Sequence, residues 1–216
     1  MDRRMSGAVI IGAGGHARCV IDTMQAAGVE IAGVVDVTPD SKVVLGVPVI
    51  GGDAELVNLR AAGLTHAAMG IGSVGDATIR RQAAARALDA GFTFDPVAHP
   101  SAVVSEHASL ARGAYVGAGA VIGPGATIGE FAIVNSSAVV DHDCAVGAFA
   151  HVAPGAVLAG TVTVGDDAHV GAGAAVIQGR TIGASAIVGA GSVVTKDIPE
   201  GETWLGNPAR ARQGHA

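Results

Sequence analysis

The chain is poor in aromatic residues, cysteine and charge, and each shortage narrows the class of protein that it can be. Aromatic residues make up 3% of its 216 residues, which suits a narrow core filled by Val, Ile and Ala. Two cysteines, Cys19 and Cys144, provide no disulfide framework. Charged residues make up 15%, and a net charge of −6 gives no support to nucleic-acid binding.

A long apolar run is also missing, so we expect no membrane-spanning segment. The longest charge-free runs, such as residues 113–129, are interrupted by Gly and Pro and lack the dense apolar character of a spanning helix. The first four residues and the short apolar stretch 8–11 resemble a signal peptide only faintly, because the apolar core is too short. These features predict a cytoplasmic protein without a membrane partner.

What the sequence does have is a six-residue repeat between Val104 and Pro199. Counting in sixes from Val104, sixteen successive positions are all Val, Ile or Leu. Four residues after each comes a second position that is mostly Ala, with Cys144 in the same register, and that departs from this pattern only at Val162, Arg180, Ser192 and Ile198. This period fits neither an α-helix nor simple strand alternation. It is typical of a repeat architecture in which each unit buries its apolar residue by stacking on its neighbours. Three hexads would close a coil of eighteen residues, so residues eighteen apart would lie one above the other.

The composition of the sequence changes near His99-Pro100, which predicts two domains, residues 1–97 and 98–216. In the first domain, strands and helices are expected to alternate, as in an α/β domain with a parallel sheet. The expected strands are 8–11, 31–35, 47–50, 66–71 and 92–95, and the expected helices are one that ends at 27, 53–62 and 76–90.

A glycine-rich loop, Gly12-Ala13-Gly14-Gly15-His16-Ala17, directly follows the first expected strand, and Asp36 ends the second. This is the G-x-G-x-x-[G/A] arrangement in a strand–turn–helix context, in which bare glycine backbone lets a phosphate approach the positive end of a helix. The domain is large enough for one nucleotide but not for the two halves of an NAD domain. We expect a bound nucleotide phosphate here; a structural glycine turn and an NAD site are the alternatives.

Groups that can accept protons gather in one part of the repeat, at Asn135, Asp141-His142-Asp143, His151 and His169. His142 occupies the third, outward position of its hexad, beside carboxylates that could orient its ring and raise its basicity. By the period of eighteen, Gly160 lies one coil along from His142, and His169 one coil along from His151. A glycine N–H beside a basic histidine is the pairing that acyl transfer needs: a base for an attacking amine and a donor for the thioester oxyanion.

Other interpretations of these residues stay open. His142 could be an ordinary surface histidine among acids. The stacked pair His151 and His169 could ligate zinc, although no convincing third ligand accompanies it. Three of the five basic residues after residue 96 lie beyond residue 195, and they suit an anionic ligand such as coenzyme A as well as a solvated tail.

Taken in order, the GAGGHA loop, the small α/β domain, the repeat with NSSAVVDHDC and AHVAPGAVLAG, and the final WLGNPAR resemble one family across nearly the whole chain. This family is the sialic-acid-O-acetyltransferase-like branch of the hexapeptide-repeat acyltransferases, which includes UDP-4-amino-sugar and GDP-perosamine N-acetyltransferases. The resemblance implies a left-handed parallel β-helix and a homotrimer with active sites between neighbouring prisms. Overall similarity favours the GDP-perosamine enzymes.

The resemblance also implies roles for individual residues. His142 would be the catalytic base and Asp143 its support, where the family can have a longer Glu. His151 would lie by the acetyl-CoA thioester, whose carbonyl oxygen the Gly160 amide would bind. The coenzyme would run past Gly189 and Ala190 toward Asn207 and Pro208. The nucleotide sugar would contact Gly12, Gly14, Gly15, His16, Asp36 and Asn135.

The sequence therefore predicts an acetyl-CoA-dependent N-acetyltransferase that uses no metal and acts on the 4-amino group of a nucleotide-linked 4-amino-4,6-dideoxy sugar, for lipopolysaccharide O-antigen synthesis. The amine would attack the thioester directly, without an acyl-enzyme. Cys144 falls in the inward small-residue register, which makes it a poor nucleophile. Three alternatives are an O-acetyltransferase for sialic acid or a similar sugar, a zinc-dependent hydrolase or carbonic anhydrase on the same scaffold, and a non-enzymatic trimeric binding scaffold.

Overall fold

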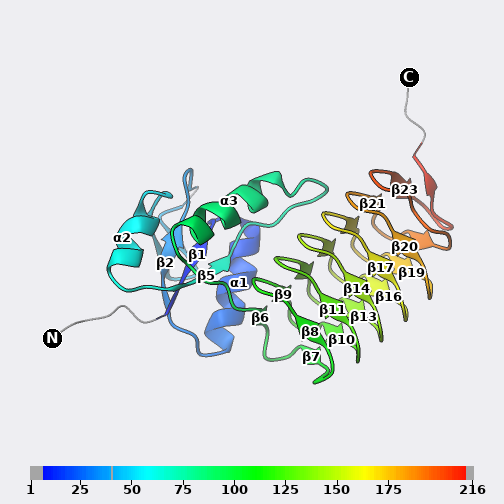
Figure 1. Cartoon of the computed structure of the whole chain (residues 1–216), viewed down its shortest axis with the longest axis horizontal. Helices are drawn as coiled ribbons and strands as arrows, with labels where there is room; N and C mark the ends of the chain where they lie inside the picture. Colours follow the sequence, from blue (N-terminus) through cyan, green and yellow to red (C-terminus); the bar gives the residue numbers. More distant parts are fainter. Residues whose placement is uncertain (1–6, 40, 213–216) are drawn as a thin grey trace. The chain divides into compact units, whose positions relative to one another are not determined.

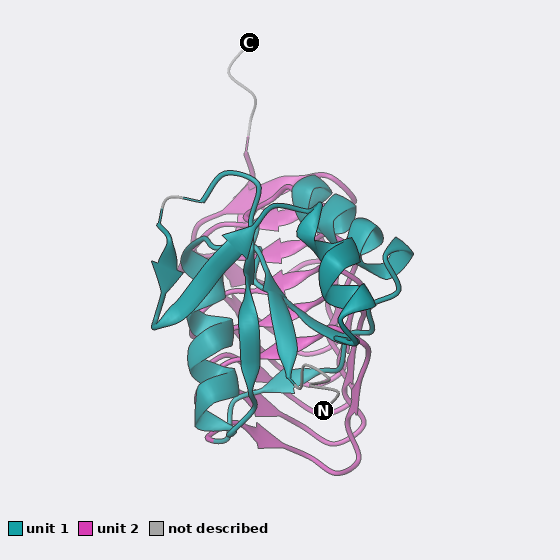
Figure 2. Cartoon of the chain, turned by 90° about the vertical axis from the view of Figure 1, so that its left-hand side faces the viewer, with its two compact units in different colours: residues 1–73, 77–100 teal, residues 74–76, 101–216 magenta. Residues whose placement is uncertain are grey.

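The structure is a computed structural model that describes residues 7–39 and 41–212. It divides into two compact units (Figure 2). Unit 1 comprises Met1–Ser73 and Ala77–Pro100, and unit 2 comprises Val74–Asp76 and Ser101–Ala216.

Unit 1 is an α/β unit built on a five-stranded sheet of order β3-β4-β2-β1-β5. Its strands are β1 (Ala8–Ile11), β2 (Ile31–Val35), β3 (Val43–Val44), β4 (Val47–Gly51) and β5 (His66–Met69), and β6 (Val97–Ala98) follows them; its helices are α1 (Gly15–Ala26), α2 (Glu55–Ala61) and α3 (Thr78–Asp89). All pairs in the sheet are parallel except β3–β4. Helices lie on both sides of the sheet (Figure 2), which is why all four residues of the central β1 are buried. Among the described residues, none of the helices has the length and apolar character to cross a membrane.

Two local features of unit 1 differ from the sequence prediction. The strand expected at 92–95 is wrong, because only Thr93 pairs, in an isolated bridge to His66. Pro96 follows closely, and proline has no N–H to continue a ladder. The antiparallel β3–β4 pair was not anticipated. Its two connecting residues, Leu45 and Gly46, both have positive φ (46° and 81°), as a tight two-residue hairpin turn requires.

Unit 2 is a left-handed parallel β-helix, a prism whose short strands stack coil upon coil (Figure 1). One face, in the order β22-β19-β16-β13-β10-β7, contains Val193–Val194, Ala175–Val176, Val157–Leu158, Val139–Val140, Val121–Ile122 and Val103–Val104. The second face, β20-β17-β14-β11-β8, contains Thr181–Ile182, Thr163–Val164, Ala145–Val146, Thr127–Ile128 and Ser109–Leu110. The third, β23-β21-β18-β15-β12-β9, contains Thr203–Leu205, Ile187–Val188, His169–Val170, His151–Val152, Ile133–Val134 and Tyr115–Val116, and β24 (Arg210–Ala211) pairs antiparallel with β23.

The strand pairing confirms the coil of eighteen residues. Val140 pairs with Leu158, and Leu158 pairs with Val176, each eighteen positions on. The aliphatic residues and the small residues four positions later fill the narrow interior. The frequent Gly after the aliphatic residue has a steric cause: a Cβ on Gly123 would lie 2.7 Å from the backbone nitrogen of His142 in the next coil. The fold therefore sets both the repeat and the position of every outward side chain on it.

Candidate active site

His142 and Asp143 lie at the corner that joins β13 to β14. The His142 side chain is 45% exposed, and its Nδ1 lies 2.9 Å from Asp143 Oδ2. Asp143 has a left-handed φ of 57°, a conformation that Asp adopts more readily than most residues. The carboxylate of Asp143, although shorter than that of a Glu, thus reaches the His142 ring directly. Asp141, for which the sequence suggested no separate role, accepts the His142 N–H at 2.7 Å and fixes the backbone there.

The hydrogen bond that the His142 ring donates to Asp143 is the main reason that the pKa of His142 is raised above its ordinary 6.5. Desolvation is the next largest effect and lowers this pKa, while the negative charges of Asp141 and Asp143 each raise it by a smaller amount. Because Nδ1 faces the carboxylate, Nε2 is the nitrogen available to take a proton. The arrangement is that of an oriented base with increased basicity.

Gly160 lies one coil along, directly against the His142 ring. A Cβ on Gly160 would fall on the imidazole at Nε2, so only glycine leaves the ring in this position. In the part of the chain that the structure describes, no acceptor takes up the Gly160 N–H. The structure therefore brings together a proton-accepting nitrogen and a backbone donor, which can serve an amine and a carbonyl oxygen respectively.

Asn135, His151 and His169 form a second cluster in unit 2. Asn135 Oδ1 accepts the Ser136 N–H at 2.8 Å, which turns its amide nitrogen toward His151 Nε2, 3.2 Å away. His151 Nε2 therefore accepts, and the ring carries its proton on Nδ1. The His151 and His169 rings meet edge-on, with centroids 4.9 Å apart. Across residues 7–39 and 41–212, no group of three or more His, Cys, Asp or Glu is arranged to hold a metal ion, so this pair lacks a third ligand.

The glycine loop of unit 1 leaves the start of α1 open. Gly12 has a φ of 97°, and a Cβ there would collide with Ile71. Around Gly14 and Gly15, by contrast, a Cβ would lie more than 4 Å from the non-neighbouring atoms of residues 7–39 and 41–212. Among the residues that the structure describes, no side chain caps the N-terminus of α1, where His16 is the second helical residue. Uncapped N–H groups at the positive end of a helix form a binding site for an anion such as a phosphate.

Asp36 makes contacts that the sequence did not predict. Its Oδ2 accepts the Ala13 N–H of the glycine loop at 2.7 Å, and its Oδ1 accepts the Thr38 N–H at 2.8 Å. The carboxylate thus ties the loop after β1 to the loop after β2. The two strands are parallel neighbours whose carboxyl ends meet at one edge of the sheet, and this adjacency is the signal that could have indicated the contact.

At the C-terminal end, the expected coenzyme residues lie in two environments. The Gly189 N–H donates to the Trp204 carbonyl at 2.9 Å, so this amide is engaged within the fold. Ala190, Asn207 and Pro208 are exposed, the last two in the turn between β23 and β24. Cys144 is buried, and burial raises the pKa of its thiol, which leaves it poorly suited to nucleophilic attack.

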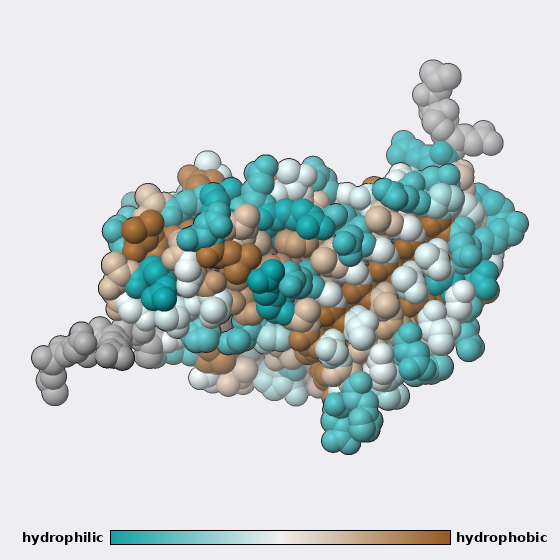
Figure 3. Space-filling view, in the orientation of Figure 1, coloured by the Kyte–Doolittle hydropathy of each residue, from teal (hydrophilic) through white to brown (hydrophobic). Residues whose placement is uncertain are grey.

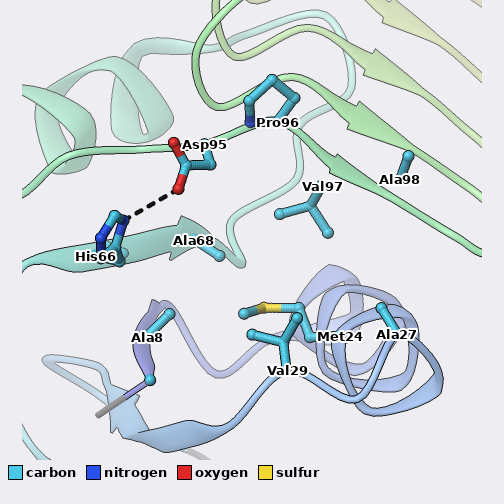
Figure 4. A pocket seen from close by; sticks show the side chains of 12 residues that line it. Ala8, Met24, Ala27, Val29, His66, Ala68, Asp95, Pro96, Val97 and Ala98 are labelled. Carbon is cyan, nitrogen blue, oxygen red and sulfur yellow. Dashed lines mark ion pairs between the residues drawn. The ribbon is translucent and has the colours of Figure 1, made fainter. Parts of the chain in front are cut away.

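A cavity of about 320 Å³ in unit 1 lies away from the glycine loop. Met24, Val29 and Val97 face it, and the ion pair of His66 and Asp95 (3.1 Å) lies beside it (Figure 4). It is at the amino ends of β1 and β5, whereas the glycine loop follows the carboxyl end of β1. Ligands of open α/β sheets bind at the carboxyl ends, so this cavity is not part of the candidate site.

Comparison with known proteins identifies a family model that matches most of unit 1 and solved structures that match nearly the whole chain. Residues 8–87 match the family model of the PglD N-terminal domain. A variant of perosamine N-acetyltransferase from Caulobacter crescentus, solved with CoA and GDP-perosamine, is 45% identical, with 97% of this chain and 98% of that chain covered and a TM-score of 0.93. The comparison with curated proteins finds no match.

Two further solved structures are similar over almost their whole length. The acetyltransferase domain of PglB from Neisseria gonorrhoeae, in complex with acetyl coenzyme A, is 36% identical with a TM-score of 0.87, covering 95% of this chain and 98% of that one. WeeI from Acinetobacter baumannii is 25% identical with a TM-score of 0.84, covering 96% and 100%. The chain belongs to the family of hexapeptide-repeat sugar N-acetyltransferases.

Proposed function

We propose that the protein transfers the acetyl group of acetyl-CoA to the 4-amino group of GDP-perosamine. The observation that carries this proposal is the similarity, at 45% identity over nearly both full chains, to an N-acetyltransferase whose structure contains CoA and GDP-perosamine. The pairing of His142 with Asp143 and Gly160 supports it, because direct acyl transfer to an amine needs a base and an oxyanion donor.

In the proposed reaction the neutral amine attacks the thioester carbonyl, and His142 Nε2 takes the proton that the nitrogen loses. The Gly160 N–H stabilises the oxyanion while the new C–N bond is formed. The product of this attack is a tetrahedral intermediate. When it collapses, the C–S bond breaks and the proton passes from His142 to the departing CoA sulfur. Asp143 keeps Nδ1 protonated and the ring in place, so no acyl-enzyme is required.

The two domains predicted from the sequence have separate tasks in this proposal. Residues 1–97 bind the nucleotide sugar, whose diphosphate fits the open N-terminus of α1 at Gly14, Gly15 and His16, with Gly12 and Asp36 shaping the loop. Residues 98–216 bind acetyl-CoA; the residues assigned to it are His151, Gly160, Gly189, Ala190, Asn207 and Pro208. Asn135, assigned to the sugar on sequence grounds, also holds the tautomer of His151.

A homotrimer is part of the proposal, and one prism face supports it. The outward residues of the face β22-β19-β16-β13-β10-β7 are Val193, Ala175, Val157, Val139, Val121 and Val103. Of these, Val103, Val121 and Val157 are 63%, 37% and 41% exposed. Figure 3 shows apolar rows running across unit 2 between polar residues. The other three outward residues of this face are half-buried, and an apolar strip of exposed and half-buried residues of this kind marks a protein–protein interface.

We also place the reaction in the cytoplasm, in the synthesis of a lipopolysaccharide O-antigen. Cys19 and Cys144 are not joined in a disulfide, and Cys19 is exposed, which suits a reducing compartment. Direct recognition of a nucleotide-linked sugar suits a step before that sugar is joined to a glycan.

A thermal-shift screen combined with an assay of CoA release tests the proposed activity. A ligand at about 100 times its Kd stabilises the native state by about 2.7 kcal/mol. GDP-perosamine should therefore raise the Tm by several degrees, whereas UDP-linked 4-amino sugars should not, and CoA should be released only with the GDP sugar. Stabilisation and turnover with UDP sugars alone would contradict the proposed substrate.

A further inference from the structure

Thr161 has an unusual backbone conformation beside Gly160. Its φ is 60°, and it is the one β-branched residue with positive φ among the residues that the structure describes. A β-branched side chain in this region is a steric outlier, and such residues cluster where the strain serves a function. The equivalent positions in the preceding and following coils are Asp143 (φ 57°) and Gly179 (φ 69°). Asp and Gly adopt positive φ more readily than a β-branched residue, so either residue type at 161 would have reduced the strain.

The contacts of Thr161 show what this strain maintains. The Thr161 N–H donates to the His142 carbonyl at 2.9 Å. Its hydroxyl donates to the Gly160 carbonyl at 2.7 Å, an oxygen that also accepts the Gly179 N–H at 3.0 Å. The peptide plane between Gly160 and Thr161 is therefore held at both ends, by two donors at its oxygen and one acceptor at its N–H.

Gly160 needs such restraint because it lacks a side chain and its backbone is intrinsically the most mobile. Its neighbouring peptide plane fixes its ψ and thereby limits how its own N–H can point. The same peptide plane is bonded to His142, so one residue sets the orientation of the backbone donor and its position relative to the base. A glycine at 161 would relieve the strain but would remove the hydroxyl.

We infer that Thr161 is a positioning residue, which holds the Gly160 amide and the His142 backbone in the geometry for acyl transfer. This inference rests on the proposed function, because it assigns Thr161 to that reaction. It acts through Gly160 and His142 and touches no reacting atom. The hydroxyl is the part that a close isostere can remove, and serine is the residue that can restore it.

The test compares Thr161→Val, Thr161→Ser and Thr161→Gly with the wild type in steady-state kinetics. Thr161→Val and Thr161→Gly should lower kcat about tenfold, less than the 10²–10³-fold effect of losing an oxyanion donor outright. KM for both substrates should stay within about twofold, and Thr161→Ser should recover most of kcat. The Tm of Thr161→Gly should stay near that of the wild type, because relief of strain offsets the lost hydrogen bond.

The matched control is Ser185→Gly, since Ser185 has the same left-handed conformation (φ 56°) at another corner. It should leave kcat unchanged. An unchanged kcat in Thr161→Val, or an equal loss in Thr161→Ser and Thr161→Val, would overturn the inference.

Hydrogen exchange separates this inference from the proposed function. In Thr161→Val, but not in Thr161→Ser, the hydrogen-bonded amides of Thr161 and Gly179 should exchange faster while those near Ser185 keep their rates. If the wild type released no CoA from any nucleotide sugar, the proposed function would fail, and unchanged exchange in Thr161→Val would independently refute the positioning role.

Discussion

At the scale of single residues, the contact between His142 and Asp143 determines how activity depends on pH. The base must be neutral to take a proton, and Asp143 raises the pKa of His142 above 6.5. Activity should therefore fall as the pH drops through this raised value. In Asp143→Asn the charged hydrogen-bond acceptor is lost, so the pKa of His142 should fall. The acidic limb of the kcat/KM profile should therefore move to lower pH, and the maximum value of kcat/KM should decrease. A profile with an unmoved acidic limb would show that Asp143 does not tune this base.

His142→Asn tests the base itself. A general base contributes about 10²–10⁴-fold, so kcat should drop by two to four orders of magnitude. The side chain is 45% exposed and packs little, so the Tm and the affinities for both substrates should remain near those of the wild type. Thermal denaturation, ligand titration and steady-state kinetics measure the three quantities. Wild-type turnover in this variant would exclude His142 from the mechanism.

Gly160→Ala should affect activity far more than stability. The new Cβ would displace the His142 ring, a side chain that can swing toward solvent, so the Tm should change little while kcat falls about 10²-fold or more. Gly129→Ala provides the opposite case, because its Cβ would lie 2.7 Å from the backbone nitrogen of Ala148. Backbone cannot move aside as easily, so this variant should lose about 1–3 kcal/mol of stability but keep its turnover per folded molecule. The same effect in both variants would contradict the special position of Gly160.

The sequence predicted some of these residue contacts and could not have predicted others. The closeness of Gly160 to His142 follows from counting, because a period of eighteen fixes which residues stack. The hydrogen bond between the Gly189 amide and the Trp204 carbonyl depends on how the irregular C-terminal segments fold back. Such segments follow no period, so their hydrogen bonds cannot be read from spacing.

At the scale of elements, Asp36 links the loops that follow two neighbouring strands, and its loss should weaken one substrate selectively. Asp36→Asn keeps one acceptor oxygen, so it can satisfy only one of the two N–H groups, at Ala13 and Thr38. The glycine loop should become less ordered, and KM for the nucleotide sugar should rise about tenfold while KM for acetyl-CoA stays unchanged.

The control for this variant is Asp53→Asn. Asp53 is an acidic residue of the same unit, and its Oδ2 lies 2.6 Å from Arg86 Nε in an ion pair at the surface. This substitution should leave both KM values near those of the wild type. If Asp36→Asn changed KM for acetyl-CoA to the same extent as KM for the sugar, the effect would be general rather than confined to the loop.

The elements themselves were predictable to the degree that their pattern is regular. The six-residue repeat predicts the coils of the prism because the aliphatic residue of each hexad must face one narrow interior. In unit 1 the buried β1 and β2 follow from short apolar runs with turn residues after them. The segment 92–95 has a strand-like pattern, with Phe92 and Phe94 buried, but its backbone pairs only at Thr93. An alternating pattern of apolar side chains indicates which residues are buried, but it does not show whether the backbone pairs with another strand.

At the scale of the whole molecule, the exposed aliphatic strip of the prism should hold the copies of the chain together. Val157→Lys places a charge in the middle of this strip, where an interface would desolvate it without a partner. The variant should be monomeric in sedimentation or light-scattering measurements, whereas the wild type should be a trimer. Because the resemblance places the active site between neighbouring prisms, the monomer should lose acetyl transfer but still be stabilised by GDP-perosamine.

Thr163→Lys is the matched control for this substitution. Thr163 is also exposed and lies one hexad later, but on the face of β20-β17-β14-β11-β8, whose outward residues are mostly Ser and Thr. A lysine there stays in water and should leave both the trimer and the turnover intact. If Val157→Lys stayed trimeric, or if Thr163→Lys alone dissociated the protein, the contact between copies would have to lie on another face. A monomeric wild type with full activity would remove the trimer from the proposed mechanism altogether.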